Sequence, residues 1–144
     1  MHLQEKILNA IKTLNYEMLV DLDCGDEADL NFFMVKDGID ICPLHAAASK
    51  GSIKVLEIIL ENKFLNINLR NQAGLNAFWI ACSYRNGEAM RMLANKGIDM
   101  MVKSDEDVNP LHLAVKKNYP ELVEMMLESG YPLDHETKQG MTAF

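Results

Sequence analysis

The sequence predicts an all-α solenoid, in which antiparallel helix pairs stack in one line and hairpin-like fingers project between them. The first observation is a repeat: Pro43-Leu44 returns in altered form as Ala77-Phe78, Pro110-Leu111 and Ala143-Phe144, about 33 residues apart. A period this short suits one supersecondary unit that buries its apolar face only against a copy of itself. The second observation is that each copy holds two apolar runs at helical spacing. The third is the polar, turn-rich stretch that follows each pair of runs.

The first full copy shows why each element is expected. Pro43 has no N–H and a fixed φ, so it favours the first turn of a helix, and Gly51 favours the left-handed geometry that ends one. A second apolar run, residues 53–60, follows after about two residues, which makes the two helices antiparallel. The polar stretch 66–74 is then expected to form an extended finger leading to the next copy.

The later copies repeat this order with substitutions. In the third copy Pro110 opens the first helix and Asn118 takes the place of Gly51. In the second copy Ala77 replaces the proline, Trp79 replaces the histidine, and Gly87 comes two residues late. We expect helix pairs at 3–22, 43–61, 77–95 and 110–129 and fingers near 35–42, 69–75, 102–108 and 135–141. The side chains expected to be buried between helices are Leu56, Ile59, Leu93 and Leu127.

The two ends of the chain depart from the repeat. Residues 1–36 are interpreted as a degenerate N-terminal capping repeat, in which we align Asn15 with Gly51, and residues 37–144 as about three full repeats. Residues 140–144 begin one more copy and stop within its first helix, without the polar capping repeat that usually closes a solenoid. We therefore expect the chain to be a piece of a longer protein.

Composition narrows the classes of function. The net charge of −7 argues against a nucleic-acid-binding surface, which is usually basic. No apolar stretch approaches the roughly 20 residues of a membrane span, and the first residues lack a signal-peptide pattern. Three widely spaced cysteines favour reduced thiols, which predicts a cytoplasmic protein, with a nuclear location as the alternative.

Residues 42–47 (Cys-Pro-Leu-His-Ala-Ala) and 109–114 (Asn-Pro-Leu-His-Leu-Ala) resemble the Thr-Pro-Leu-His-x-Ala signature of ankyrin repeats. The resemblance covers about residues 37–144 and implies an ankyrin-repeat solenoid that binds another protein in a concave groove. It also implies that the signature histidine hydrogen-bonds backbone between repeats, and that Asn68 stands where some dioxygenases hydroxylate asparagine. The signature threonine is replaced by Cys42, Asn76 and Asn109; asparagine can cap a helix in its place, whereas cysteine does so poorly.

No residue pattern points to catalysis, a cofactor, a metal ion or a small-molecule substrate. His45 and His112 occupy the same repeat position two stacking steps apart, with Trp79 between them, so they cannot converge on one metal. Cys82 falls on the alanine position of a first helix, where a buried, inert thiol is expected. We therefore predict that this segment is not an enzyme.

The row of apolar residues two positions before each Pro43 equivalent is the strongest candidate for a binding surface. It consists of Ile41, Leu75, Val108 and Met141, and it favours either packing within the fingers or an apolar stripe for a partner protein. Tyr84 is the best single anchor, because aromatic residues carry much of the energy of interfaces. The other expected partner-binding residues lie on fingers or at the ends of inner helices: Ile39, Ser49, Lys50, Gln72, Ser83, Asp105, Glu106, Lys116, Lys117 and Lys138. The leading hypothesis is a protein–protein interaction module; the alternative is a regulatory or targeting domain of a larger enzyme or channel that continues beyond Phe144.

Overall fold

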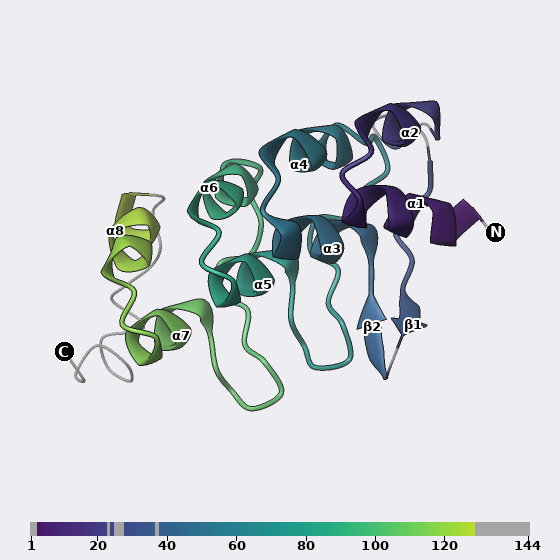
Figure 1. Cartoon of the computed structure of the whole chain (residues 1–144). Coiled ribbons are helices and arrows are strands. Elements are labelled where there is room, and N and C mark those ends of the chain that lie inside the picture. Colours follow the sequence, from purple (N-terminus) through teal and green to yellow (C-terminus); the bar gives the residue numbers. More distant parts are fainter. Residues whose placement is uncertain (1–2, 23, 25–27, 37, 129–144) are drawn as a thin grey trace.

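The computed structural model describes residues 3–22, 24, 28–36 and 38–128 of the chain. These residues form a row of short helices with one small hairpin near the N-terminal end (Figure 1). In chain order the elements are α1 (Leu3–Lys12), α2 (Tyr16–Asp21), β1 (Met34–Lys36), β2 (Ile39–Ile41), α3 (Pro43–Lys50), α4 (Ile53–Leu60), α5 (Ala77–Ser83), α6 (Gly87–Asn95), α7 (Pro110–Lys116) and α8 (Pro120–Glu128).

The helices form two layers, and the fingers project from one side of the array (Figure 1). The inner layer is α1, α3, α5 and α7, and each of these helices packs against the next one in the row. The outer layer is α2, α4, α6 and α8; each outer helix packs against the inner helix that precedes it, and α4 bridges α2 and α6. The expected stack of antiparallel helix pairs is confirmed within the described residues, whereas the finger expected at 135–141 lies outside them.

The starts of the inner helices follow the sequence signature. Pro43 and Pro110 stand in the first turns of α3 and α7, where a missing N–H costs no intrahelical hydrogen bond. Asn76 and Asn109 cap α5 and α7, because each side-chain oxygen accepts the N–H of the residue three positions on, at 3.0 and 2.8 Å. Cys42 makes no side-chain cap bond to α3, as expected for cysteine.

The ends of the inner helices correct two details of the predicted alignment. The left-handed residue is Gly51 after α3 (φ 68°) and Asn118 after α7 (φ 52°), as expected, but it is Arg85 rather than a glycine after α5 (φ 57°). Gly87 instead begins α6. After α1 the left-handed residue is Leu14 (φ 55°), so the expected alignment of Asn15 with Gly51 is wrong by one residue.

The corrected alignment explains burial in the first unit. Asn15 corresponds to Ser52, and both side chains accept an N–H at the start of an outer helix. Leu19 then corresponds to Leu56, and both are completely buried, whereas Val20 is 62% exposed. The first unit is therefore in register with the later repeats from its outer helix onward.

The core lies between the two helix layers. Leu56, Ile59 and Leu93 are fully buried, as expected. Leu127 is 51% exposed, so its expected burial is wrong, and Met126 is buried instead. The physical reason is register: the buried face of α8 is Leu122, Met125 and Met126, spaced i, i+3, i+4, and the next residue points about 100° away from that face.

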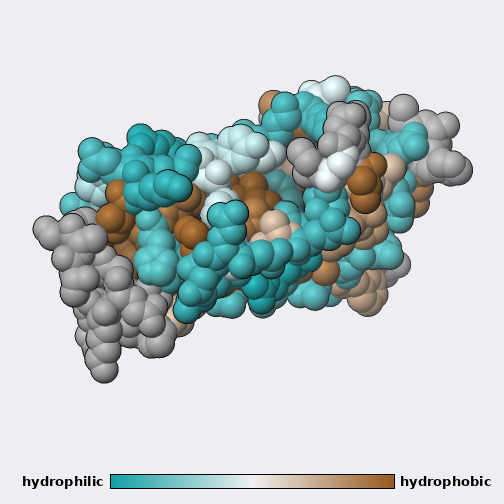
Figure 2. Space-filling model, turned by 90° about the horizontal axis from the view of Figure 1, so that it is seen from below, coloured by the Kyte–Doolittle hydropathy of each residue, from teal (hydrophilic) through white to brown (hydrophobic). Residues whose placement is uncertain are grey.

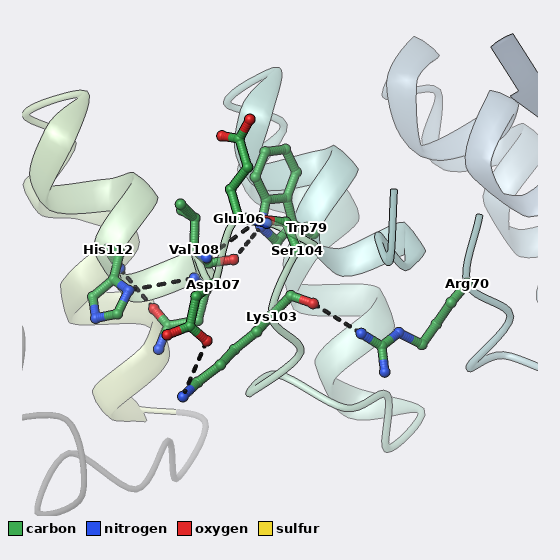
Figure 3. Close-up of polar contacts among 9 residues, drawn as sticks. Arg70, Trp79, Lys103, Ser104, Glu106, Asp107, Val108 and His112 are labelled. Carbon is green, nitrogen blue, oxygen red and sulfur yellow. Dashed lines mark hydrogen bonds and ion pairs between the residues drawn. The ribbon is translucent and has the colours of Figure 1, made fainter. Parts of the chain in front are cut away.

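The fingers are joined to one another by polar contacts. The first finger is an antiparallel hairpin that pairs Met34 with Ile41. The next two are turns closed by Asn71 N–H to Leu75 O (3.0 Å) and Ser104 N–H to Val108 O (2.9 Å). Between fingers, Asp40 accepts the Gln72 N–H (2.9 Å), Ala73 O accepts the Asp105 N–H (2.9 Å), and Arg70 donates to Lys103 O (2.8 Å; Figure 3). These bonds hold successive fingers in a fixed spacing.

Candidate binding groove between the fingers and the inner helices

Three neighbouring hollows follow the inner helices along the bases of the fingers, and together we call them the groove. The first hollow (about 340 Å³) is lined by Glu5, Leu8, Asn9, Lys12, Met34, Val35 and Ile41. The central hollow (about 510 Å³) is lined by Lys12, Asp40, Ile41, His45, Ala46, Ser49, Lys50, Asn71, Leu75, Trp79, Ile80, Ser83 and Tyr84. The third hollow (about 380 Å³) is lined by Ala73, Leu75, Trp79, Ser104, Asp105, Glu106, Val108, Leu113 and Lys116. Seen from the finger side, separate apolar patches lie among hydrophilic side chains along the array (Figure 2).

The apolar finger row connects these hollows. Ile41 belongs to the first and central hollows, Leu75 to the central and third, and Val108 to the third. All three side chains are half-buried, so they both pack within the fingers and contribute apolar surface to the groove. Met141 lies outside the described residues.

The other expected binding residues divide into three groups. Ser49, Lys50, Ser83 and Tyr84 line the central hollow, and Asp105, Glu106 and Lys116 line the third. Gln72 is exposed on a finger and Lys117 is exposed at the end of α7, and neither residue lines these hollows. The structure places the backbone of Ile39 in β2, and Lys138 lies outside the described residues.

Trp79 is the groove residue that sequence reasoning missed. Its side chain lines both the central and the third hollow, and its Nε1–H donates to Val108 O at 2.9 Å (Figure 3). The sequence does hold a signal for this role, because Trp79 occupies the position of the signature histidine. A ring at that position reaches the next finger. It is the only tryptophan of the chain.

His45 has the inter-repeat role that the resemblance implies. Its Nε2–H donates to Leu69 O at 3.0 Å, and its ring meets Phe33 edge-on at 5.7 Å. Its Nδ1 is buried without a hydrogen-bond partner. Burial lowers the pKa of His45, because a second proton would place a positive charge where no acceptor meets it.

His112 takes part in a helix cap. It belongs to the capping box of α7, where its Nδ1 accepts the Asn109 N–H at 3.5 Å.

The described cysteines are buried thiols. Cys24, Cys42 and Cys82 are all buried, and none of them forms a disulfide. Burial raises the pKa of Cys42 to about 11 and raises the pKa of Cys82 as well. Thiols held in the neutral form are poor nucleophiles.

Within the described part of the chain, no cluster of histidine, cysteine and carboxylate side chains is arranged to hold a metal ion. Among the same residues, no helix has both the length and the apolar character needed to cross a membrane.

Comparison with known proteins identifies the family. A family model described as ankyrin repeats (3 copies) matches residues 8–104 and 44–139. The chain belongs to the ankyrin-repeat family. Ankyrin repeats are a non-catalytic fold that generally binds other proteins, and the earlier start of the match at residue 8 agrees with the repeat-like packing of α1 and α2.

Relatives of the chain are much longer proteins of several kinds. The human transient receptor potential cation channel subfamily A member 1 is 30% identical over 90 residues, which cover 62% of this chain and 8% of the channel. Palmitoyltransferase AKR1 of Kluyveromyces lactis is 29% identical over 136 residues, covering 90% of this chain and 17% of the transferase. Tyrosine-protein kinase HTK16 of Hydra vulgaris is 26% identical over 114 residues, covering 78% of this chain and 15% of the kinase.

Proposed function

We propose that the chain binds a segment of another protein in the groove between its fingers and inner helices. The observation that carries this proposal is the continuity of the apolar finger row with the groove: Ile41 lines the first and central hollows, Leu75 the central and third, and Val108 the third. Contiguous apolar surface that is left open to water is typical of sites that contact a partner.

Tyr84 strengthens the proposal because it stands at the edge of the central hollow with 62% of its surface exposed. A tyrosine gives a large apolar ring and a polar hydroxyl at little entropic cost, which is why the residue recurs at the centre of interfaces. The polar rim of the groove, supplied by Ser49, Ser83 and Glu106, completes the usual pattern of an apolar centre and a hydrophilic edge.

The proposal includes the remaining expected contacts. Gln72 and Lys117 would meet a partner that extends beyond the hollows onto a finger tip or the end of α7. Residues 1–36 would serve as the N-terminal capping repeat of the array formed by 37–144. Three buried cysteines that form no disulfide fit a reducing compartment such as the cytoplasm.

The test is Leu75→Asp, assayed with a partner segment that binds the purified chain. A carboxylate at this position would be desolvated against apolar surface, so we expect affinity to fall at least about tenfold. Because Leu75 is half-buried, circular dichroism must show that the Leu75→Asp variant is folded. Tyr84→Ala is a second variant that should not disturb folding, because the side chain of Tyr84 is largely exposed. The matched control is Glu57→Lys on the exposed face of α4, which should leave the affinity nearly unchanged. A partner bound equally well by Leu75→Asp and Tyr84→Ala would contradict a groove-based site.

The second candidate function is a regulatory or targeting domain within a larger enzyme or channel. It is favoured by the relatives, since a channel, a palmitoyltransferase and a kinase each carry a segment similar to this chain within a far longer polypeptide. The sequence of the reading frame beyond residue 144 decides between the candidates: a catalytic or membrane domain there supports the second, and further repeats or a stop codon support the first alone.

A further inference from the structure

A fourth hollow lies on the outer helix layer, between α2 and α4, and we call it the outer hollow. These two helices stand next to each other at the N-terminal end of the outer layer, on the side away from the fingers (Figure 1). The outer hollow has a volume of about 570 Å³ and is lined by Tyr16, Glu17, Val20, Asp21, Lys54, Glu57, Ile58 and Glu61. None of these residues lines the groove, so the outer hollow is a separate surface.

Negative charge is concentrated on the outer hollow. Four of its lining side chains are carboxylates and one is an ammonium group, which gives a net charge of −3 on these eight residues, against −7 for the whole chain. Glu17 and Asp21 are one turn apart on α2, and Glu57 and Glu61 are one turn apart on α4 and its C-cap. Like charges at this i, i+4 spacing repel each other, and a negative charge at a helix C-terminus, where Asp21 and Glu61 stand, is also unfavourable.

The protein does not pair these charges itself. Within the described part of the chain, none of the four carboxylates takes part in an ion pair. The ammonium group of Lys54 lies over the ring of Tyr16, 4.5 Å from its centroid. Lys63, which follows α4, is exposed but does not line the hollow. The acidic walls are therefore open to a cationic ligand.

The other end of the outer layer is built differently. Arg91 of α6 and Glu128 of α8 form an ion pair at 3.1 Å, so these two outer helices place opposite charges against each other. In contrast, α2 and α4 place carboxylates on both sides of their hollow. The packing of outer helices alone therefore does not account for the acidic walls.

Apolar surface is exposed between the carboxylates. Val20 is 62% exposed, and Ile58 and the ring of Tyr16 are half-buried. The aliphatic stem of a lysine or arginine packs well on such a surface while its charged head reaches a carboxylate. Among the described residues, no three carboxylate, histidine or cysteine side chains converge on a possible metal position. The spacing of the acids therefore fits several separate cationic side chains better than one metal ion.

We propose that the outer hollow binds a basic segment of another protein. Its Lys or Arg side chains would bridge the carboxylates of α2 and α4, and an adjacent apolar side chain would pack on Val20 and Ile58. Charge complementarity is the basis of this inference, because a basic ligand would relieve the repulsion within each helix and thereby stabilise the folded chain as it binds. The outer hollow and the groove share no lining residue, so the inference does not depend on the proposed function.

The experiment selects ligands for this hollow alone. A random peptide library displayed on phage is panned against the purified chain in the presence of excess soluble Glu57→Lys variant, which removes peptides that bind elsewhere. Selected peptides are synthesised with a fluorescent label for anisotropy titrations. We expect them to carry Lys or Arg beside an apolar residue, and we expect their affinity to fall as salt is raised.

Three variants and a control locate the binding. Glu57→Lys and Asp21→Lys should each weaken the selected peptides about tenfold, and Val20→Thr, which replaces a methyl group by a hydroxyl, should weaken them about fourfold. Lysine is favourable at the end of α2, so Asp21→Lys should be at least as stable as the parent in urea denaturation, and its loss of binding is not a loss of folding. The control Glu124→Lys makes an equal charge change at an exposed position of α8, and should change affinity less than about twofold.

The outcomes separate this inference from the groove. A library that yields no peptide under this counter-selection, or only acidic or uncharged peptides, overturns the inference and leaves the groove untouched. Equal losses in Glu57→Lys and Glu124→Lys would show a general attraction to an acidic protein and overturn it as well. Peptides that bind Val20→Thr as tightly as the parent contradict the apolar contact. Leu75→Asp should bind the selected peptides as well as the parent does, and a loss there would contradict a separate site.

Discussion

Replacing Ile59 by alanine tests the core that holds the repeats in line. Ile59 is fully buried on α4, which packs against α3 and lies between α2 and α6. The change removes three carbon atoms, each worth about 0.8 kcal/mol of burial, so the transfer term alone is about 2.4 kcal/mol. A residual cavity adds about 24 cal/mol per Å³. The expected loss in the free energy of unfolding is therefore about 2–5 kcal/mol.

Urea denaturation followed by circular dichroism and by the fluorescence of Trp79 provides the assay. The two probes report on all helices and on α5 respectively, so coincident transitions show that the array unfolds as one unit. The matched control is Leu127→Ala, which removes the same number of carbons from a side chain that is 51% exposed, and should cost about 1 kcal/mol or less. An Ile59→Ala variant within about 0.5 kcal/mol of the parent would refute the assignment of α4 to the core.

Two further predictions concern titratable groups. Burial lowers the pKa of His45, so below about pH 6.5 the unfolded chain binds a proton that the folded chain does not. The free energy of unfolding should therefore fall as the pH drops below that value. Urea titrations at several pH values should show a weaker pH dependence for His45→Gln than for the parent chain. Burial raises the pKa of Cys42 from 9.0 to about 11, so the thiol of the unfolded chain ionises first, and the free energy of unfolding should fall by up to about 3 kcal/mol between these pH values. At neutral pH, a thiol reagent such as Ellman's should label Cys24, Cys42 and Cys82 only after denaturant is added. Rapid labelling of the folded chain would contradict their burial.

The solenoid could be predicted because its signals are local. Pro43 and Pro110 favour a helix start and exclude a helix interior, and Gly51 and Asn118 favour the left-handed turn that ends a helix. Since the same signals recur in phase, their spacing fixes the number and order of the helix pairs. The prediction of the fold therefore required no knowledge of long-range contacts.

The errors arose where the local signal is missing. Leu14 and Arg85 adopt left-handed φ values although neither residue is a glycine or an asparagine. The missing signal at Leu14 shifted the alignment of the first unit, and the missing signal at Arg85 led to the alignment of Gly87 with Gly51. Arg85 is held there by contacts made across the repeat: its guanidinium lies 5.0 Å over the ring of Tyr119 and donates to Lys117 O. Contacts of this kind depend on neighbouring repeats, so a single window of sequence does not reveal them.

The candidate groove was predicted in part for the same reason. Its finger row followed from one repeat position, whereas Trp79 enters the groove because the ring reaches across to Val108 of the next finger. Similarly, Leu127 differs from Met126 by one residue in an apolar run, and only the packing of α8 shows which of them is buried.

The intrinsic fluorescence of Trp79 tests the central claim most directly, because the only tryptophan of the chain lines two of the three hollows of the groove. A peptide that is selected on the parent chain and still binds Glu57→Lys should shift or quench this emission in a saturable titration, with the midpoint that anisotropy gives for the same peptide. The signal should be lost in Leu75→Asp and kept in Glu57→Lys. A peptide of this kind that saturates the chain by anisotropy while leaving the emission of Trp79 unchanged would contradict binding in the groove.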